Sequence, residues 1–402
     1  SLFIRRSMPE REATELLGKI SVGMWLRVSG RMELSYDGKD MQLNPQDIMQ
    51  IDHAERTDTA EEKRVELHLH TTMSSMDALT KTGDAVATAA RWGHKAIAIT
   101  DHGVVQAFPD AANRAAKLRG KGKDIKIIYG MEGYLYPDED AMLPDGTIDI
   151  KKNRTHHIIL LAKNLTGLRN LYKMVSYSHV DYFYKKPSFP RSVLQQHREG
   201  IIVGSACEAG ELYQAINRGA SREELLQIAD FYDYLEIQPL GNNAFMIRDE
   251  DSDIASNDDL IDINKRIVKL GEEFGKLVVA TCDVHFLNPE DEVYRRIIMA
   301  GKGFKDADEQ APLYLRTTEE MLKEFEYLGS KKAEEVVITN TNKIADMCER
   351  ISPVRPDKCP PVIENSDGML REICYNKAHR MYGDPLPKIV EDRLEHELHS
   401  II

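Results

Sequence analysis

The sequence has no apolar run long enough to cross a lipid bilayer, so we expect no membrane partner. It has five cysteines, an odd and scattered set that does not suit a disulfide framework and fits a reducing, cytoplasmic location. It also has no excess of positive charge, because the formal net charge is −13. That balance argues against nucleic-acid binding by bulk electrostatics alone. A local basic groove or bound divalent ions would still reverse the field at one site.

The chain has 402 residues, 42% of them hydrophobic and 30% charged, which is enough for two or three domains. Residues 1–50 alternate apolar and polar positions and carry an Asp37-Gly38 hairpin signal. They predict a short β-meander or part of an OB-like barrel, acting either as a plain packing element or as a nucleic-acid contact. Residues 54–64 have the composition of a linker. Because the first residue is Ser1, we expect a piece of a longer protein.

From residue 65 onward, strand and helix patterns alternate. Seven strands are predicted at Val65–His70, Lys95–Asp101, Lys126–Tyr136, His156–Ala162, Gly200–Ala206, Tyr232–Gln238 and Leu277–Phe286. Helices are predicted at Asp84–Trp92, Phe108–Leu118, Ser221–Phe231 and Leu260–Phe274. This alternation predicts an α/β fold with a mostly parallel sheet, and seven units favour a closed or nearly closed barrel. Active sites in such barrels lie at the carboxyl ends of the strands.

Metal-binding side chains gather at the predicted strand ends. His68 and His70 are two residues apart in a strand, so both imidazoles project from one face. Alone, this pair is better explained as two exposed histidines. Further residues with metal-binding side chains are Asp77, Asp101, His102, Glu132, His156, His157, Cys207, Asp283 and His285. Together they favour a metal site for zinc, manganese or iron, with too many ligands for a single ion.

Six motifs, in this order, carry a family resemblance: HLHTTMSSMDA, AIAITDHG, IIYGMEGY, HHIILLAKNLTGLRNL, GSACEAGEL and ATCDVHFLN. The chain resembles the PHP (polymerase and histidinol phosphatase) domain of bacterial replicative DNA polymerase III alpha subunits, of the Gram-positive PolC type. The resemblance implies a distorted seven-stranded barrel, which agrees with the strand count. It also implies a domain order of an OB-like unit with linker at 1–62, the metal-binding barrel at 63–302 and a helical segment at 303–402.

The resemblance further implies up to three divalent ions, zinc or manganese and also iron, held by nine residues. The implied ligands are His68, His70, Asp77, His102, Glu132, His157, Cys207, Asp283 and His285. His157 is chosen because it directly precedes an x-x-Leu-Leu-Ala run, and His156 remains an alternative. The catalytic candidates are Asp283 together with His102 and His285, either of which would orient a ligand or protonate the leaving group.

Two departures from the family bear on function. PolC enzymes carry a proofreading exonuclease inserted between the strands of Glu132 and His157, where this chain has only a short segment. The chain also stops near where the polymerase palm would begin, so this fragment alone is not expected to polymerise DNA. The resemblance implies metal-dependent phosphodiester hydrolysis, as a 3′–5′ exonuclease on DNA. The alternatives are a silent, metal-stabilised structural module and a phosphatase or pyrophosphatase.

The implied partners are DNA and the rest of the polymerase, namely its palm, fingers and thumb. The full-length enzyme would also meet the sliding clamp and other replisome proteins. One loop, residues 181–192, interleaves three aromatic residues with Lys185, Lys186 and Arg191. It suits stacking and phosphate contact with a single strand, and an ordinary exposed loop explains it equally well.

Overall fold

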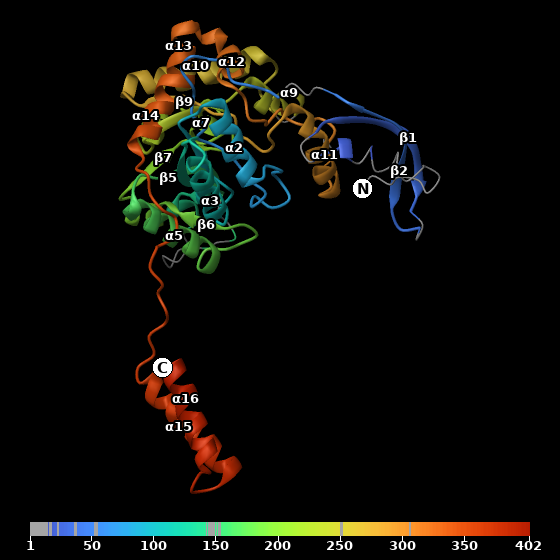
Figure 1. The fold of residues 1–402 in the computed structure, drawn as a ribbon. Coiled ribbons are helices and arrows are strands. Elements are labelled where there is room, and N and C mark those ends of the chain that lie inside the picture. The colour runs from blue at the N-terminus through green and yellow to red at the C-terminus, as the bar shows by residue number, and fades with distance from the viewer. Residues whose placement is uncertain are drawn as a thin grey trace. The chain divides into compact units, whose positions relative to one another are not determined.

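The computed structural model describes the chain except residues 1–14, 16–17, 22–23, 36–37, 52–54, 142, 144–148, 150, 152–153, 250–251 and 305–306. The chain divides into two compact units, Ser1–Ile351 and Ser352–Ile402 (Figure 1). Among the described helices, none is long and apolar enough to cross a membrane. The expected division at 62/63 and 302/303 stays a prediction. In the structure, helix α14 (Asn340–Met347) contacts strand β9 (Leu277–Ala280) of the barrel, so helices after residue 303 belong to the first unit.

The N-terminal β unit is a two-stranded antiparallel sheet of β1 (Leu26–Leu34) and β2 (Met41–Gln50). The register shifts between Ser29 and Gly30. A side chain at Gly30 would place its Cβ 2.1 Å from the Asn44 carbonyl oxygen, so this bulge requires glycine. The described part of this unit has fewer strands than an OB-fold barrel. Asp37 of the expected hairpin turn lies outside the described residues.

The main sheet has seven strands, and it confirms the predicted α/β barrel. Its order is β3-β4-β5-β7-β8-β9, with β6 paired to β4. Pairing is parallel except that β5 runs antiparallel to both neighbours. The strands are β3 (Ala96–Ile99), β4 (Lys126–Tyr136), β5 (His156–Ala162), β6 (Ser188–Pro190), β7 (Ile201–Gly204), β8 (Tyr234–Ile237) and β9 (Leu277–Ala280).

Residues 65–70, expected as the first strand, form isolated bridges rather than a full ladder. Glu66 pairs with Ile97 of β3, and Leu69 pairs with Val284 after β9, both in parallel. The amide of His70 donates to the Val284 carbonyl at 2.8 Å. The segment therefore lies between the first and last strands of the sheet and joins its two edges.

Helices of the first unit surround this sheet (Figure 1). Two predicted helix boundaries are confirmed. The Ser221 hydroxyl caps α8 (Arg222–Asp230) by accepting from the Glu224 amide. Helix α2 (Thr82–Trp92) ends at Gly93, which has a φ of 83°. The helices of the first unit are α2 (Thr82–Trp92), α3 (Phe108–Arg119), α4 (Asp138–Ala141), α5 (Leu165–Val180), α6 (Arg191–Gln196), α7 (Glu211–Asn217), α8 (Arg222–Asp230), η1 (Leu240–Asn243), α9 (Phe245–Arg248), α10 (Asn257–Phe274), η2 (Pro289–Asp291), α11 (Glu292–Gly301), α12 (Thr318–Glu324), η3 (Glu326–Leu328), α13 (Ser330–Glu334), η4 (Glu335–Thr339) and α14 (Asn340–Met347). The second unit has α15 (Ser366–Tyr382) and α16 (Lys388–Ile401), which pack against each other.

Buried charged groups link the segment before residue 65 to the barrel and to α12. One carboxylate oxygen of Asp58 accepts from the Thr318 amide at 2.8 Å and from its hydroxyl at 2.7 Å, and lies 2.8 Å from His94 Nε2. Burial would raise the pKa of Asp58, but the hydrogen bonds from His94 and Thr318 hold it well below its usual range. Arg64 and Glu66 form a fully buried ion pair at 2.7 Å. These contacts anchor the chain just before the first two site histidines.

Candidate metal centre

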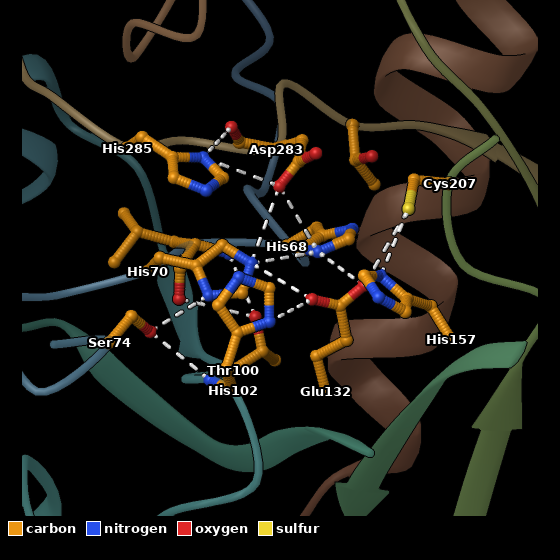
Figure 2. A network of polar contacts seen from close by, with 12 residues as sticks. His68, His70, Ser74, Thr100, His102, Glu132, His157, Cys207, Asp283 and His285 are labelled. Atoms are coloured by element: carbon orange, nitrogen blue, oxygen red, sulfur yellow. Dashed lines mark hydrogen bonds and ion pairs between the residues drawn. The ribbon is translucent and has the colours of Figure 1, made fainter. Parts of the chain in front are cut away.

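All nine residues expected as ligands lie in one cluster. Figure 2 shows eight of them, and Asp77 joins the cluster through its contacts with His102 and His285. Four of them, His102, Cys207, Asp283 and His285, follow the carboxyl ends of β3, β7 and β9. Glu132 lies within β4, and His68, His70 and Asp77 belong to the segment that precedes α2. His157 stands instead at the amino end of β5, and the antiparallel direction of β5 brings that end to the same edge of the sheet. The expected gathering of these side chains at one barrel mouth is therefore what the structure contains.

The ring orientations of the first two histidines are fixed by buried hydrogen bonds. His68 Nδ1 lies 2.7 Å from a carboxylate oxygen of Glu236, which can only accept, so Nδ1 carries the proton. His70 Nδ1 lies 3.0 Å from the Ser74 hydroxyl, and that hydroxyl donates to Asp101 at 2.7 Å. Ser74 therefore accepts from His70. Both rings consequently direct Nε2 into the site, where it is the atom that would bind an ion.

These two Nε2 atoms converge on a common point. They are 3.1 Å apart, and Asp283 Oδ1 lies 3.2 Å from His68 Nε2 and 3.3 Å from His70 Nε2. Asp283 Oδ1 is buried and has no hydrogen-bond donor among the described residues. Burial would lower the pKa of His68, but Asp283, Glu236 and Glu132 raise it well above its usual range, so this point favours a positive charge. Two imidazole nitrogens and a carboxylate oxygen that face one another there fit a bound cation. The residues present thus suit the divalent ion that the donor set implies.

A second group is formed by Glu132, His157 and Cys207. Glu132 Oε1 lies 2.7 Å from His157 Nδ1, and Cys207 Sγ lies 3.6 Å from Glu132 and 3.4 Å from His157. The other Glu132 oxygen lies 2.7 Å from His102 Nδ1, so this carboxylate stands between two parts of the cluster (Figure 2). Burial would raise the pKa of Glu132, but the surrounding histidines hold it well below its usual range. Burial raises the pKa of the Cys207 thiol, and a metal ion would reverse that preference by binding the thiolate.

The third group lies on the open side, where the ligand atoms of His70, His102 and His285 are within 4.8 Å of one another. Asp77 Oδ2 lies 3.1 Å from His102 Nε2 and 3.5 Å from His285 Nε2. The other oxygen of Asp77 accepts from Arg295 at 2.7 Å, and no local sequence pattern predicts this partner. Burial alone would lower the pKa of His102, but Glu132 and Asp77 raise it to about 10.

The choice between His156 and His157 follows from the sheet register. His157 pairs with Tyr134 and His156 with Leu135, so the two side chains project from opposite faces of β5. Only His157 belongs to a group of potential ligands among the described residues. The geometry favours His157.

Left-handed backbone conformations occur beside three of the site residues. Met76 and Ala206, which directly precede Asp77 and Cys207, have φ of 60°, and Asp283 itself has φ of 53°. Residues other than glycine adopt this region at a cost in free energy, and such residues gather where function fixes the backbone. The barrel therefore holds these side chains in place against a local preference.

A cleft of about 670 Å³ opens onto the cluster. Its floor includes Asp77, His102, Glu132, His157, Cys207, Asp283 and His285. Its walls carry the half-exposed rings of Phe245 and Phe304 and the cations of Arg248 and Lys302. Glu208, next to Cys207, also lines the cleft and was not predicted as a site residue. The cleft thus combines aromatic and positively charged walls with an acidic, histidine-rich floor.

Comparison with known proteins identifies the barrel. Residues 66–239 match the family model of the PHP domain. This chain contains a PHP domain. Asp283 and His285 lie beyond the matched residues, yet they complete the cluster of the PHP domain.

The resemblance to PolC-type polymerases is also confirmed over the whole chain. The chain is 35% identical to a DNA polymerase III PolC-type of Clostridium perfringens, 33% to that of Caldanaerobacter subterraneus and 30% to that of Bacillus subtilis, each match covering 100% of this chain. It spans only 40%, 42% and 41% of those relatives' lengths. The first match runs over 591 residues, although this chain has 402, so that relative carries residues with no counterpart here.

Proposed function

We propose that this chain is the PHP-containing part of a PolC-type DNA polymerase III, and that its site hydrolyses phosphodiesters in DNA as a 3′–5′ exonuclease. The observation that carries the proposal is the convergence of nine potential ligand side chains in one cluster, seven of which line the floor of an open cleft. An ion with a purely structural role needs no open cleft, whereas the 3′ end of a DNA strand needs one to reach the metal centre. DNA and the rest of the polymerase are the proposed partners, and the sliding clamp and other replisome proteins would be reached through the full-length enzyme.

The chain's residues divide the work as follows. His68, His70, Glu132 and Asp283 would hold one ion, Glu132, His157 and Cys207 a second, and Asp77, His102 and His285 a third. Divalent ions bound there supply Lewis acidity to a phosphate group and lower the pKa of a water molecule to about 7. Zinc or manganese suits the mixture of imidazole, carboxylate and thiolate, and iron is a further candidate.

The protein supplies proton transfer and positioning. The pKa of His102 is raised to about 10, with burial opposing and Glu132 and Asp77 outweighing it, so the free site keeps a protonated imidazole at the cleft. With the third ion bound, His102 and His285 would be its ligands; without that ion, His102 or His285 would donate a proton to the leaving 3′ oxygen. Arg295, which also lines the cleft, donates to Asp77 at 2.7 Å and holds that carboxylate in position.

The test uses a single-stranded DNA labelled at its 3′ end, incubated with the full chain and manganese or zinc. The wild type should release labelled mononucleotides, and a variant carrying His68→Ala and Asp283→Asn should not. Circular dichroism checks that the variant is folded. Equal release by both proteins would show that the nuclease activity comes from elsewhere and would end the proposal.

A structural role for the metals is the second candidate, because His68 and His70 are fully buried. In that case the wild type would bind metal and gain thermal stability but would hydrolyse no DNA. A phosphatase or pyrophosphatase is tested in the same assay with p-nitrophenyl phosphate and pyrophosphate. Faster turnover of these compounds than of DNA would favour that function.

A further inference from the structure

Lys186 reaches the edge of the metal centre from a separate loop. The loop joins α5 to β6, and the Lys186 Nζ lies 4.3 Å from the centre of the Tyr134 ring. That ring contacts His157 edge-on at 5.1 Å and stacks on His102 at 6.0 Å between ring centres. The ammonium group is therefore separated from two imidazoles of the site by a single aromatic ring.

The backbone around Lys186 is held by the barrel. Ser188, two residues later, pairs with Tyr134 of β4. Between these two residues, Pro187 packs so closely on Gly103 that a Cβ at Gly103 would lie 2.5 Å from a Pro187 ring carbon. Gly103 directly follows His102 in sequence. Lys186 is thus fixed both to the strand that carries Tyr134 and to the turn that carries His102.

Lys185, which precedes Lys186, has a left-handed backbone conformation, as do two residues that precede expected metal ligands. Lys185 has φ of 61°, as Met76 and Ala206 have φ of 60° before Asp77 and Cys207. The turn is closed by a hydrogen bond from the Tyr184 amide to the Lys186 carbonyl at 3.4 Å. A left-handed conformation at a residue other than glycine costs free energy, and an ordinary surface loop can avoid it. Here it turns the chain so that Lys186 lies on the Tyr134 ring.

The positive charge of Lys186 is available to a ligand. The side chain is exposed, and among the described residues it forms no ion pair. Partial burial against Tyr134 lowers its pKa, and the charge of Glu132 acts in the opposite direction. Lys186 thus lies on an aromatic ring near the proposed metal centre, and no carboxylate pairs with it among the described residues. Proteins that bind a single strand contact its phosphates with cations arranged in this way.

We propose that Lys186, seated on Tyr134, binds a backbone phosphate of a nucleic-acid strand next to the phosphodiester held at the metal centre. It is a positioning residue and takes no part in bond breaking. This inference rests on the proposed function, in that a strand with more than one phosphate is taken as the substrate.

The test compares the wild type, Lys186→Ala, Lys186→Arg and Lys185→Asn. Lys185→Asn is the matched control, because it removes the same charge one residue away and asparagine tolerates the left-handed conformation. The probe is a fluorescein-labelled oligothymidylate with phosphorothioate linkages at its 3′ end, which slow cleavage during anisotropy measurements. Hydrolysis of an unmodified oligonucleotide and of bis(p-nitrophenyl) phosphate is measured in parallel.

Lys186→Ala should weaken oligonucleotide binding by about tenfold, the loss expected for one charge-assisted hydrogen bond. It should raise KM for the oligonucleotide by a similar factor while kcat, and turnover of the small diester, stay near the wild-type values. Lys186→Arg should restore binding, and Lys185→Asn should match the wild type. Unchanged binding by Lys186→Ala, or an equal loss in Lys185→Asn, would overturn the inference. If the wild type cleaves no DNA but binding still depends on Lys186, the exonuclease proposal fails and this subsite stands.

Discussion

The decisive single-residue feature of the site is the contact between Glu236 and His68. Glu236 is buried, and besides His68 it accepts from Thr281 at 2.6 Å and Gln238 at 3.0 Å. Its charge stabilises the Nδ1 proton of His68, so Nε2 keeps its electron pair for an ion. The carboxylate thus acts on the site through the ring of His68.

Glu236→Gln removes this charge but keeps an acceptor of the same shape. We expect the affinity for zinc or manganese to fall by roughly 10- to 100-fold, as is typical when the partner of a ligating histidine is changed. The measurement is competition with a chromophoric chelator. Asp230→Asn, which changes a carboxylate that is 80% exposed, is the control and should bind as the wild type does. An unchanged affinity in Glu236→Gln would mean that His68 is oriented by packing alone.

The motifs predicted that these side chains gather, because several of them follow a strand, as Asp283 and His285 follow β9. Their role as metal ligands stays a prediction. Glu236 could not be predicted in this way. A lone Glu in a buried strand has no local signal, and its partner is 168 residues away. Arg295 was missed for the same reason, since its contact with Asp77 joins residues 218 apart. Lys186 was visible only as part of a basic and aromatic loop.

At the scale of elements, strand direction and pairing were the parts that the sequence could not supply. Alternation predicted β5, but periodicity is the same in both directions, so its antiparallel course appears only in the structure. β6 has three residues and includes Pro190, which gives too short a pattern to predict. Residues 65–70 have strand periodicity, yet they bridge two sheet edges by a few hydrogen bonds.

At the same scale, the hydrogen bonds of Asp58 join the segment before the barrel to the start of α12. Removing them tests how much this connection contributes to the free energy of unfolding. Asp58→Asn should lower the free energy of unfolding at pH 7 by about 2 kcal/mol, since hydrogen bonds to a buried charge are lost. The folded-state pKa of Asp58 is lowered, so its contribution is present above the unfolded value of about 3.9 and is lost as the pH falls below it.

Urea unfolding of both proteins at pH 7 and pH 3 checks this. The difference between them should shrink at the lower pH. Thr59→Ala, which removes an exposed neighbouring hydroxyl, is the control for changes in this segment and should have a much smaller effect. A difference that stays constant with pH would show that the carboxylate charge of Asp58 does not contribute.

At the scale of the whole molecule, the metal centre joins residues from β4, β5, the segment 68–77 before α2, and the segments that follow β3, β7 and β9. The three carboxylates of Asp77, Glu132 and Asp283 lie within this small volume. Bound divalent ions would therefore stabilise the barrel as a whole, because the unfolded chain has no such arrangement.

Removal of the ions with dipicolinate should lower Tm by several degrees. A ligand at 100 times its Kd contributes about 2.7 kcal/mol to the native state. Scanning calorimetry before and after chelation, and after zinc or manganese is restored, measures the effect. The His68→Ala, Asp283→Asn variant should respond little to the chelator. A wild-type Tm that does not change on chelation would exclude a stabilising role.

The connection between the two compact units should be the first site of limited proteolysis. Lys358 is exposed and lies between α14 and α15, and it is not followed by proline. Trypsin is expected to cut there before it cuts the helices around the barrel, as mass spectrometry of the early fragments will show. Lys358→Gln should delay this cut. Early cleavage within α5 or α10 instead would contradict the division into two units.

The antiparallel direction of β5 determines where a domain inserted between β4 and β5 would lie. Because β4 leaves the barrel and β5 re-enters it at the same edge, their connection begins and ends beside the metal cluster. Any domain inserted into this connection would begin and end beside the mouth of the cleft. On the proposed function, gain or loss of such an insertion would change which site the end of a strand reaches first.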